Sequence, residues 1–157
     1  MNEQRRRVLK TGGGVGVIAL MVSAGLLRPD EAAAAEWNKA AFDTKGVPDT
    51  VKALGASGPV ESKDVEFFQT PDIAENGAVV PIGIASRIPK TESIAVLIEK
   101  NPNTLAANFE IPPDTEATIL TRVKMAQTSN VYALVKADGK YYVASKEIKV
   151  TLGGCGG

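Results

Sequence analysis

The sequence predicts a mainly β protein: a seven-stranded antiparallel β-sandwich of immunoglobulin-like type, with a short N-terminal helix and a flexible C-terminal arm. Apolar and polar residues alternate with a period of two over several short segments, as in 105–111 and 131–135. Turn-forming pairs such as Asn76-Gly77 and Asp138-Gly139 separate these segments. No helices intervene between the predicted strands, which favours an antiparallel sandwich over a parallel α/β sheet.

The elements can be assigned in chain order. A helix is predicted over 48–56, because Pro48 fits the first turn, Asp49 lies beside the positive end of the helix dipole and Gly55 supplies a stop. Pro81 cannot donate a hydrogen bond to a sheet, so we expect its strand to lie at an edge or to carry a bulge. Strands are predicted at 62–69, 78–85, 93–100, 105–111, 116–125, 130–137 and 140–152.

Residues 1–35 are predicted to be a twin-arginine signal peptide. The segment RRRVLK at 5–10 resembles the twin-arginine pattern, with Val8 where phenylalanine is commoner. The apolar stretch 14–27 is shorter than the roughly 20 residues of a membrane span, and Ala33 and Ala35 fit a cleavage site. We therefore expect export of the folded protein to the periplasm and no membrane association after cleavage; a permanent N-terminal anchor is the alternative.

Composition excludes several classes of function. The chain carries 18 basic and 18 acidic residues, and without residues 1–35 it has 13 and 15, which argues against binding of nucleic acid. It contains no histidine, so it lacks the usual general base and the commonest metal ligand. One cysteine cannot build a thiolate zinc or iron–sulfur site. We therefore predict no catalytic residue, no metal and no cofactor.

The most informative feature is the C-terminal GGCGG, in which Cys155 lies between Gly153 and Gly154 on one side and Gly156 and Gly157 on the other. A single cysteine in an oxidising compartment is a free thiol, an intermolecular disulfide or a covalent attachment point. Its sulfur lies within about 10 Å of the end of the last predicted strand, since three extended residues reach no further.

An exposed thiol is a liability through oxidation, so its presence favours a function. We predict a sandwich domain at 36–152 and a carrier arm at 153–157 that holds a covalent cargo. The carboxylate of Gly157 disfavours a thiolate at Cys155, so activation by a partner's active site is expected. A disordered tail with an incidental cysteine is the alternative for the segment itself.

Four segments of the chain resemble the SoxY family, the sulfur carriers of the periplasmic sulfur-oxidising (Sox) system. The C-terminal motif is the specific part, and the matching segments are AENGAVVPI (74–82), EKNPNTLAANFEI (99–111), TRVKMAQTSNVYALVKADGKYY (121–142) and KEIKVTLGGCGG (146–157). The resemblance implies a non-catalytic carrier on which Cys155 is joined oxidatively to thiosulfate. Gly153, Gly154, Gly156 and Gly157 would form the arm that presents the cargo to sulfur-oxidising enzymes.

The resemblance also implies partners. These are a SoxZ-like subunit in a heterodimer, a SoxXA-like c-type cytochrome that loads thiosulfate, a SoxB-like hydrolase that releases sulfate, and a SoxCD-like sulfane dehydrogenase that oxidises the remaining sulfur. Two alternatives remain. A structural β-sandwich could form a disulfide-linked homodimer through its single cysteine, and ubiquitin-like sulfur carriers also end in Gly-Gly, although they are cytoplasmic and carry no leader.

Overall fold

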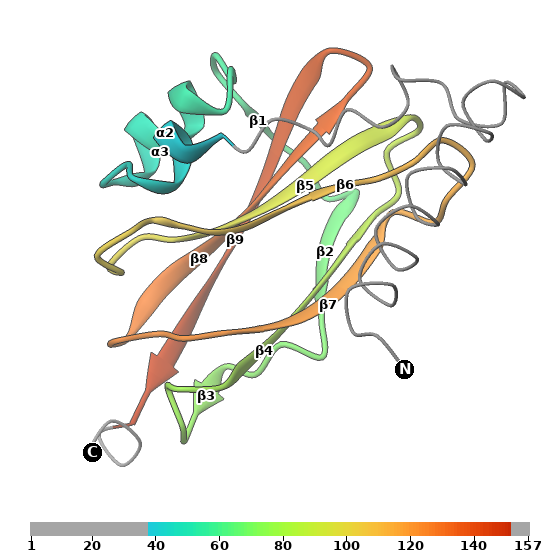
Figure 1. Ribbon diagram of the computed structural model, residues 1–157. Helices are drawn as coiled ribbons and strands as arrows, with labels where there is room; N and C mark the ends of the chain where they lie inside the picture. Colours follow the sequence, from blue (N-terminus) through green and yellow to red (C-terminus); the bar gives the residue numbers. More distant parts are fainter. Residues whose placement is uncertain (1–37, 152–157) are drawn as a thin grey trace, which may run out of the picture. The chain divides into compact units, whose positions relative to one another are not determined.

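The computed structural model describes residues 38–151, and Figure 1 shows how their helices and strands are arranged. Helix α2 spans Lys39–Phe42 and helix α3 spans Val47–Ala53. The strands that follow are β1 (Val60–Glu61), β2 (Val65–Phe68), β3 (Ile73–Ala74), β4 (Val80–Ser86), β5 (Thr91–Ile98), β6 (Leu105–Glu110), β7 (Thr118–Val123), β8 (Ser129–Ala137) and β9 (Lys140–Val150).

The strands form two sheets that face each other, with the helices on the outer side of the larger one (Figure 1). The larger sheet has the order β1-β9-β8-β5-β6, with β3 also paired to β9, and the smaller has the order β2-β4-β7. The predicted mainly β sandwich is confirmed, and each of the seven predicted strands has a counterpart. The antiparallel expectation is wrong for β1 and β3, which pair with β9 in parallel. The sequence also does not predict α2, because so short a segment shows no period.

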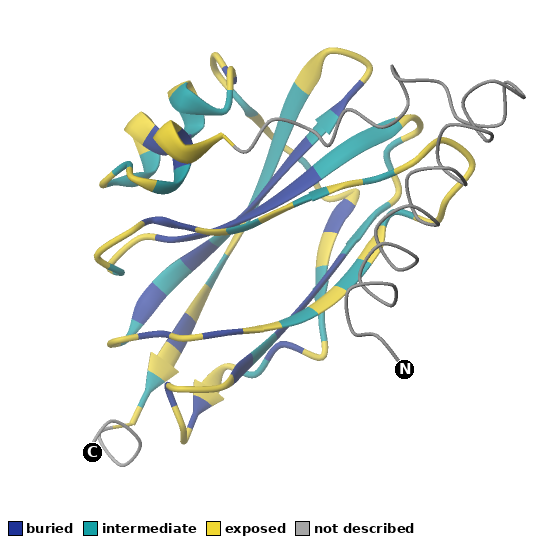
Figure 2. Ribbon diagram, viewed as in Figure 1, coloured by how far each residue is buried: buried dark blue, intermediate teal, exposed yellow. Residues whose placement is uncertain are grey.

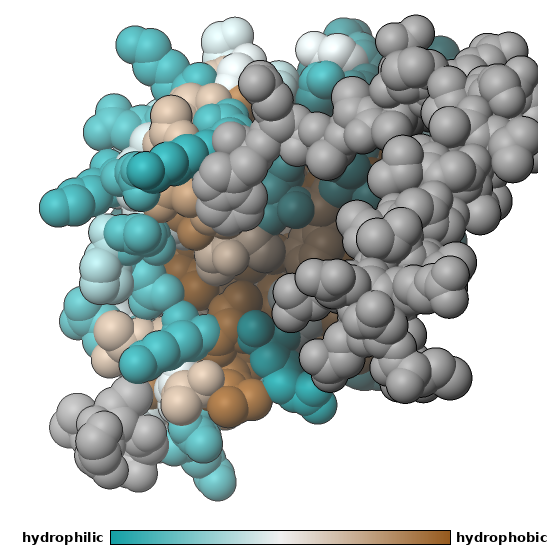
Figure 3. All heavy atoms as spheres, viewed as in Figure 1, coloured by the Kyte–Doolittle hydropathy of each residue, from teal (hydrophilic) through white to brown (hydrophobic). Residues whose placement is uncertain are grey.

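The main core lies between the two sheets. Alternate residues of β4 point into it, and Val80, Ile82 and Ile84 have no exposed surface. The larger sheet contributes further buried side chains to the same cluster, namely Ile94, Val96, Ile98, Val131, Ala133, Val135 and Ile148. Figure 2 shows the buried residues concentrated on the central strands, and Figure 3 shows hydrophobic side chains gathered between the two sheets on the face in view. This burial is the main driving force for the fold.

A second, smaller core lies between the helices and the outer face of the larger sheet. Ala95, Leu97 and Leu134 are buried there against Ala41 of α2. Strand β5 is therefore covered on both faces, which explains why its residues from Ile94 to Ile98 are all buried and show no alternation. Sequence periodicity alone could not reveal this second layer.

The sequence predicts that the strand with Pro81 lies at an edge or carries a bulge. Both alternatives are wrong, because β4 is the central strand of the smaller sheet and pairs with β2 and β7 without a register shift. The register gives the reason that proline is tolerated. Strand β2 pairs with β4 only from Gly83 to Ser86, whereas Pro81 is paired with Arg122 of β7 alone. Pro81 therefore has a strand on one side only, and the edge is local to that position.

Two further features of this part of the chain bear on the sequence predictions. Asp138 and Gly139 both have positive φ angles and join β8 directly to β9, which confirms the predicted turn. Within residues 38–151, no helix is long and apolar enough to span a membrane.

The core assignment predicts a large difference between two isoleucines of the same chain. Ile84→Ala should lower the free energy of unfolding by about 2–5 kcal/mol, because Ile84 is fully buried and the substitution leaves a cavity. Ile73→Ala is the matched control: Ile73 is 56% exposed, and its loss should cost less than about 1 kcal/mol. Urea unfolding of both variants measures this, and equal losses would contradict the core assignment.

Candidate functional site

The predicted site residues Gly153, Gly154, Cys155, Gly156 and Gly157 lie outside the described residues. The structure describes the chain up to Thr151, four residues before Cys155. Four extended residues reach at most about 14 Å. What the structure defines is therefore the root of the arm, meaning the last described residues of the chain and the groups that hold them.

One side of the arm root is held by strand β3. This two-residue strand runs parallel to the end of β9, beside Lys149 and Val150. The amide of Lys149 donates to the carbonyl of Asp72 at 2.9 Å, and the amide of Thr151 donates to the carbonyl of Ala74 at 3.1 Å. The last described residue is thus bound by a backbone hydrogen bond.

The other side of the arm root is held by a side chain. The ladder between β8 and β9 ends at the pair Ser129 and Ile148, so β9 extends beyond its partner. The amide of Val150 donates instead to the hydroxyl oxygen of Thr128 at 3.0 Å. A threonine hydroxyl therefore takes the place that a backbone carbonyl of β8 would otherwise fill.

Lys146 ties β9 to the segment that leads into β3. Residues two apart in a strand point to the same face, so Lys146 lies on the face of β9 that also carries Ala144 and Ile148. Because Ile148 is in the core and Ala144 packs against it, a lysine is unexpected at this position. Its Nζ donates to the carbonyl of Thr70 at 2.6 Å and forms an ion pair with Asp72 Oδ1 at 2.9 Å. The Lys146 side chain is only 26% exposed and that of Asp72 is 87% exposed, so the bond to Thr70 is the better shielded of the two.

The loops around the arm root are joined to one another. The carbonyl of Gly77 accepts a hydrogen bond from the amide of Met125 at 2.7 Å. The side chain of Asn101 donates to the carbonyl of Lys124 at 2.7 Å and accepts from the amide of Ala126 at 3.2 Å. Three connections between strands are thereby fixed at this end of the sandwich, and the arm starts from a well-supported base.

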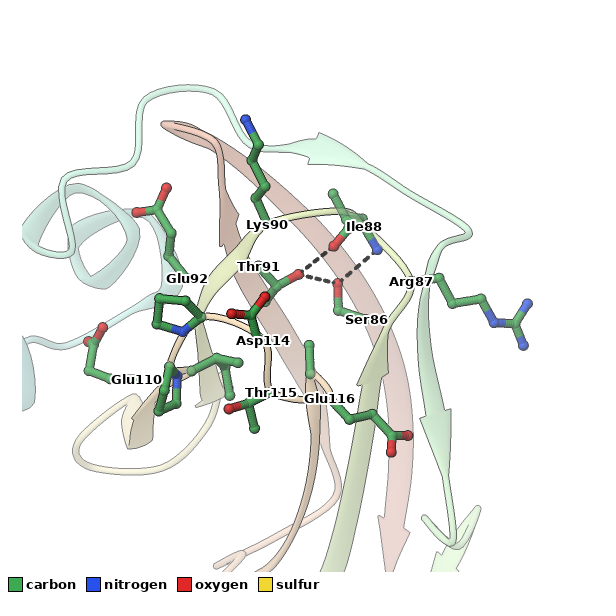
Figure 4. A pocket seen from close by; sticks show the side chains of 14 residues that line it. Ser86, Arg87, Ile88, Lys90, Thr91, Glu92, Glu110, Asp114, Thr115 and Glu116 are labelled. Carbon is green, nitrogen blue, oxygen red and sulfur yellow. Dashed lines mark hydrogen bonds between the residues drawn. The ribbon is translucent and has the colours of Figure 1, made fainter.

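A groove of about 800 Å³ lies at the opposite end of the sandwich, between the β4–β5 and β6–β7 connections (Figure 4). The hydroxyls of Ser86 and Thr91 lie 2.8 Å apart on its wall. Glu92 lines it too, and the hydrogen bond from Lys136, at 2.6 Å from Nζ, lowers the pKa of Glu92. Glu92 is thus a charged member of an ion pair, unsuited to donate a proton at neutral pH. The groove is remote from the arm root, which lies at the other end of the sandwich.

Among residues 38–151, no three side chains of histidine, cysteine, aspartate or glutamate come together as a possible metal site. What the arrangement around the arm root can do is mechanical: it holds the end of β9 in a defined place up to Thr151. The residue to which the sequence analysis assigns the chemistry, Cys155, lies outside the described residues.

Sequence reasoning misses three parts of the arm root: β3, Thr128 and Lys146. Strand β3 is too short to be seen, and nothing in the sequence relates Thr128 to a residue 22 positions later. Lys146 does leave a signal, because a lysine interrupts the inward positions of an otherwise core-forming strand. That signal indicates a bound lysine without naming its partner.

Comparison with known proteins identifies the family. The family described as "Sulfur oxidation protein SoxY" matches residues 50–155, a range that includes Cys155. The structure of the sulfur carrier protein SoxY from Chlorobium limicola f thiosulfatophilum is 36% identical in sequence, with a TM-score of 0.61, and the match covers 67% of this chain and 96% of that chain. A search among curated proteins gave no match.

A more distant likeness was found to the superoxide reductase (neelaredoxin) from Ignicoccus hospitalis. It is 16% identical, with a TM-score of 0.49, and covers 58% of this chain and 82% of that chain. A likeness of this size supports no conclusion about function. The family match, in contrast, covers residues 50–155, and the SoxY structure is 36% identical in sequence. Together they confirm the resemblance found in the sequence: the chain belongs to the SoxY family of sulfur oxidation proteins.

Proposed function

We propose that this protein is a periplasmic sulfur carrier that holds thiosulfate-derived sulfur covalently on Cys155 and presents it to sulfur-oxidising enzymes. Membership of the SoxY family is the observation that carries the proposal, since it supports a carrier role in sulfur oxidation. The position of Cys155 four residues after the anchored Thr151 agrees with a cargo held on a short arm.

The proposed loading step joins two sulfur atoms. The thiol of Cys155 loses its proton, and its sulfur forms a bond to the sulfane sulfur of thiosulfate. Two electrons leave, and a c-type cytochrome partner accepts them. A hydrolase then adds water across the bond between the sulfane sulfur and the sulfonate group, which releases sulfate and leaves a persulfide on Cys155. A sulfane dehydrogenase would oxidise that persulfide where such an enzyme is present.

The carrier itself contributes no catalysis in this proposal. A thiol becomes a good nucleophile when a cation, a base or a helix N-terminus lowers its pKa. Lys146, the lysine nearest to the core at the arm root, is already bound to Thr70 and Asp72. The loading enzyme would therefore supply the activation.

Replacement of the cysteine is the direct test. Cys155→Ser should abolish thiosulfate-dependent turnover in a reconstituted Sox system, because serine cannot form the S–S bond, and should leave folding and partner binding unchanged. Mass spectrometry of the C-terminal peptide after incubation with thiosulfate and the loading cytochrome should show a thiosulfate adduct that thiols remove. A disulfide-linked homodimer as the sole product would favour the structural alternative instead.

The glycines on either side of the cysteine provide a second test. Replacing both Gly153 and Gly154 by proline should reduce turnover, because proline fixes one backbone angle and narrows the range of positions that the sulfur can reach. Replacing both by alanine is the control, which adds a methyl group to each residue without closing a ring. If the glycines form an arm that presents the cargo, turnover should fall clearly more in the proline variant than in the alanine variant. Normal turnover by the proline variant would contradict this role.

Export and partnership complete the proposal. The twin-arginine leader at 1–35 would carry the folded protein to the periplasm, together with a SoxZ-like subunit that has no leader of its own. The purified exported protein is expected to begin at or near Glu36 and to contain this second subunit.

The outer face of the smaller sheet is the surface that best suits such a subunit. Leu120 of β7 points outward there and is 58% exposed. Gly83 of β4 lies between Leu120 of β7 and Phe68 of β2. The ring of Phe68 lies over Gly83, because a Cβ atom on Gly83 would be 3.0 Å from two ring atoms. The other outward residues of β4 are Pro81 and Ala85, so the centre of this face is apolar, as the cores of protein interfaces are. The exposed Arg122 and Glu66 lie beside it on the two flanking strands.

A charge placed on this face should weaken binding of the second subunit. Leu120→Glu should lower its affinity by about tenfold or more, since an apolar contact is replaced by a buried charge. Val60→Glu is the matched control, because Val60 is 61% exposed on the other sheet. Titration of the subunit by calorimetry measures both. Native affinity of the Leu120 variant would show that the subunit binds elsewhere.

A further inference from the structure

We propose that Lys146 acts as a latch that sets the length of the carrier arm. With the latch closed, β3 holds β9 as far as Thr151; with the latch open, β3 separates and the arm starts after Ile148. This inference rests on the proposed carrier function for its biological meaning, although the latch itself can be tested without any cargo.

Strands β8 and β3 both pair with β9 near its end, but they differ greatly in how firmly they hold it. Strand β8 pairs with β9 from Ala137 opposite Lys140 to Ser129 opposite Ile148 and buries core residues along that length. Strand β3 has two residues: Ile73 is 56% exposed, whereas Ala74 is buried in the core cluster, against which Val150 of β9 also packs. Beyond Ile148, therefore, β9 is held mainly by a short strand that buries one small side chain.

Three backbone amides mark the weakly held segment. Those of Lys149 and Thr151 donate to the carbonyls of Asp72 and Ala74, and that of Val150 donates to the hydroxyl of Thr128. The first two bonds belong to β3 and open together when it separates. The third is a single bond to a side chain and cannot hold the segment in a sheet.

Lys146 fixes β3 in place from the stable part of β9. It lies two residues before Ile148, within the region paired with β8, so its backbone stays in position when β3 moves. From there its Nζ reaches the carbonyl of Thr70 at 2.6 Å and Asp72 Oδ1 at 2.9 Å. Together with the Thr70 hydroxyl, which accepts from the amide of Gly83 at 3.0 Å, these contacts hold the segment just before β3. They give the core-facing lysine its partners.

Opening of the latch changes the reach of Cys155. The anchored arm has four residues after the last fixed residue, Thr151, and spans at most about 14 Å. Release of 149–151 moves the anchor back to Ile148 and adds about 10 Å. A carrier that serves several enzymes with active sites of different depth could use both lengths.

Amide hydrogen exchange tests the latch directly on the purified full-length protein. In Lys146→Met, the amides of Lys149 and Thr151 should exchange about tenfold faster or more, because both bonds from Lys146 to the segment before β3 are lost and only the bonds between the Thr70 hydroxyl and Gly83 still hold it. Amides in the β8–β9 ladder should keep their native rates and so show that the fold is intact. Lys140→Met is the matched control: it removes the same charge from an exposed position at the other end of the same strand.

A distance measurement tests the length of the arm. Spin labels on Cys155, the sole cysteine, and on a cysteine introduced by Thr118→Cys at the far end of β7 report their separation. In Lys146→Met the distribution should broaden and its upper limit should rise by up to about 10 Å. Unchanged exchange rates together with an unchanged distribution would overturn the proposal, whether or not Cys155 carries sulfur.

Turnover then distinguishes a latch from a merely structural lysine. Deletion of Gly153 and Gly154 shortens the arm and should slow turnover in the native background. In the Lys146→Met background the same deletion should reduce turnover less, because the released residues 149–151 make up for the lost length of the arm. An equal or larger cost in that background would show that Lys146 only stabilises the fold and would overturn the arm-length role.

Discussion

The long antiparallel pairing of β9 with β8 is the interaction on which the rest of the structure depends. It places Ile148 in the core between the sheets and lets the hydroxyl of Tyr141 donate to the carbonyl of Leu54, at 2.9 Å, where α3 ends. The same strand also receives β1 and β3. Both hydrophobic clusters and the arm root thus depend on one strand, so folding of the core also fixes the arm root.

The proposed carrier role requires a fixed base and a sulfur that can reach a partner's active site. A short tether raises the effective concentration of the cargo in a partner's active site, but only where the tether can span the distance. The arm root meets the first requirement through bonds on both sides of β9, from β3 and from Thr128. A segment that can be released in a controlled way would meet the second without loosening the core, because the bonds that open lie outside the β8–β9 ladder.

The seven main strands could be predicted because their signals are local. Alternation along 105–111 and the turn at Asp138-Gly139 depend on neighbours in sequence, and the isolation of Cys155 among glycines needs no fold to be noticed. The expectation for the Pro81 strand was wrong because the position of a strand in a sheet depends on residues that are distant in the sequence. Whether a strand is central depends on which strands lie beside it, and in β4 the second neighbour simply ends before it reaches Pro81.

The class of fold, the lack of histidine and the presence of a single thiol could all be read from the sequence. How the end of β9 is held is visible only in the folded protein. The partners of that segment, Asp72, Ala74 and Thr128, are tens of positions away in the chain, and a hydrogen bond between distant residues leaves no periodic trace. Its existence follows from the path of the chain through space, because only the folded sheets bring those groups within bonding distance.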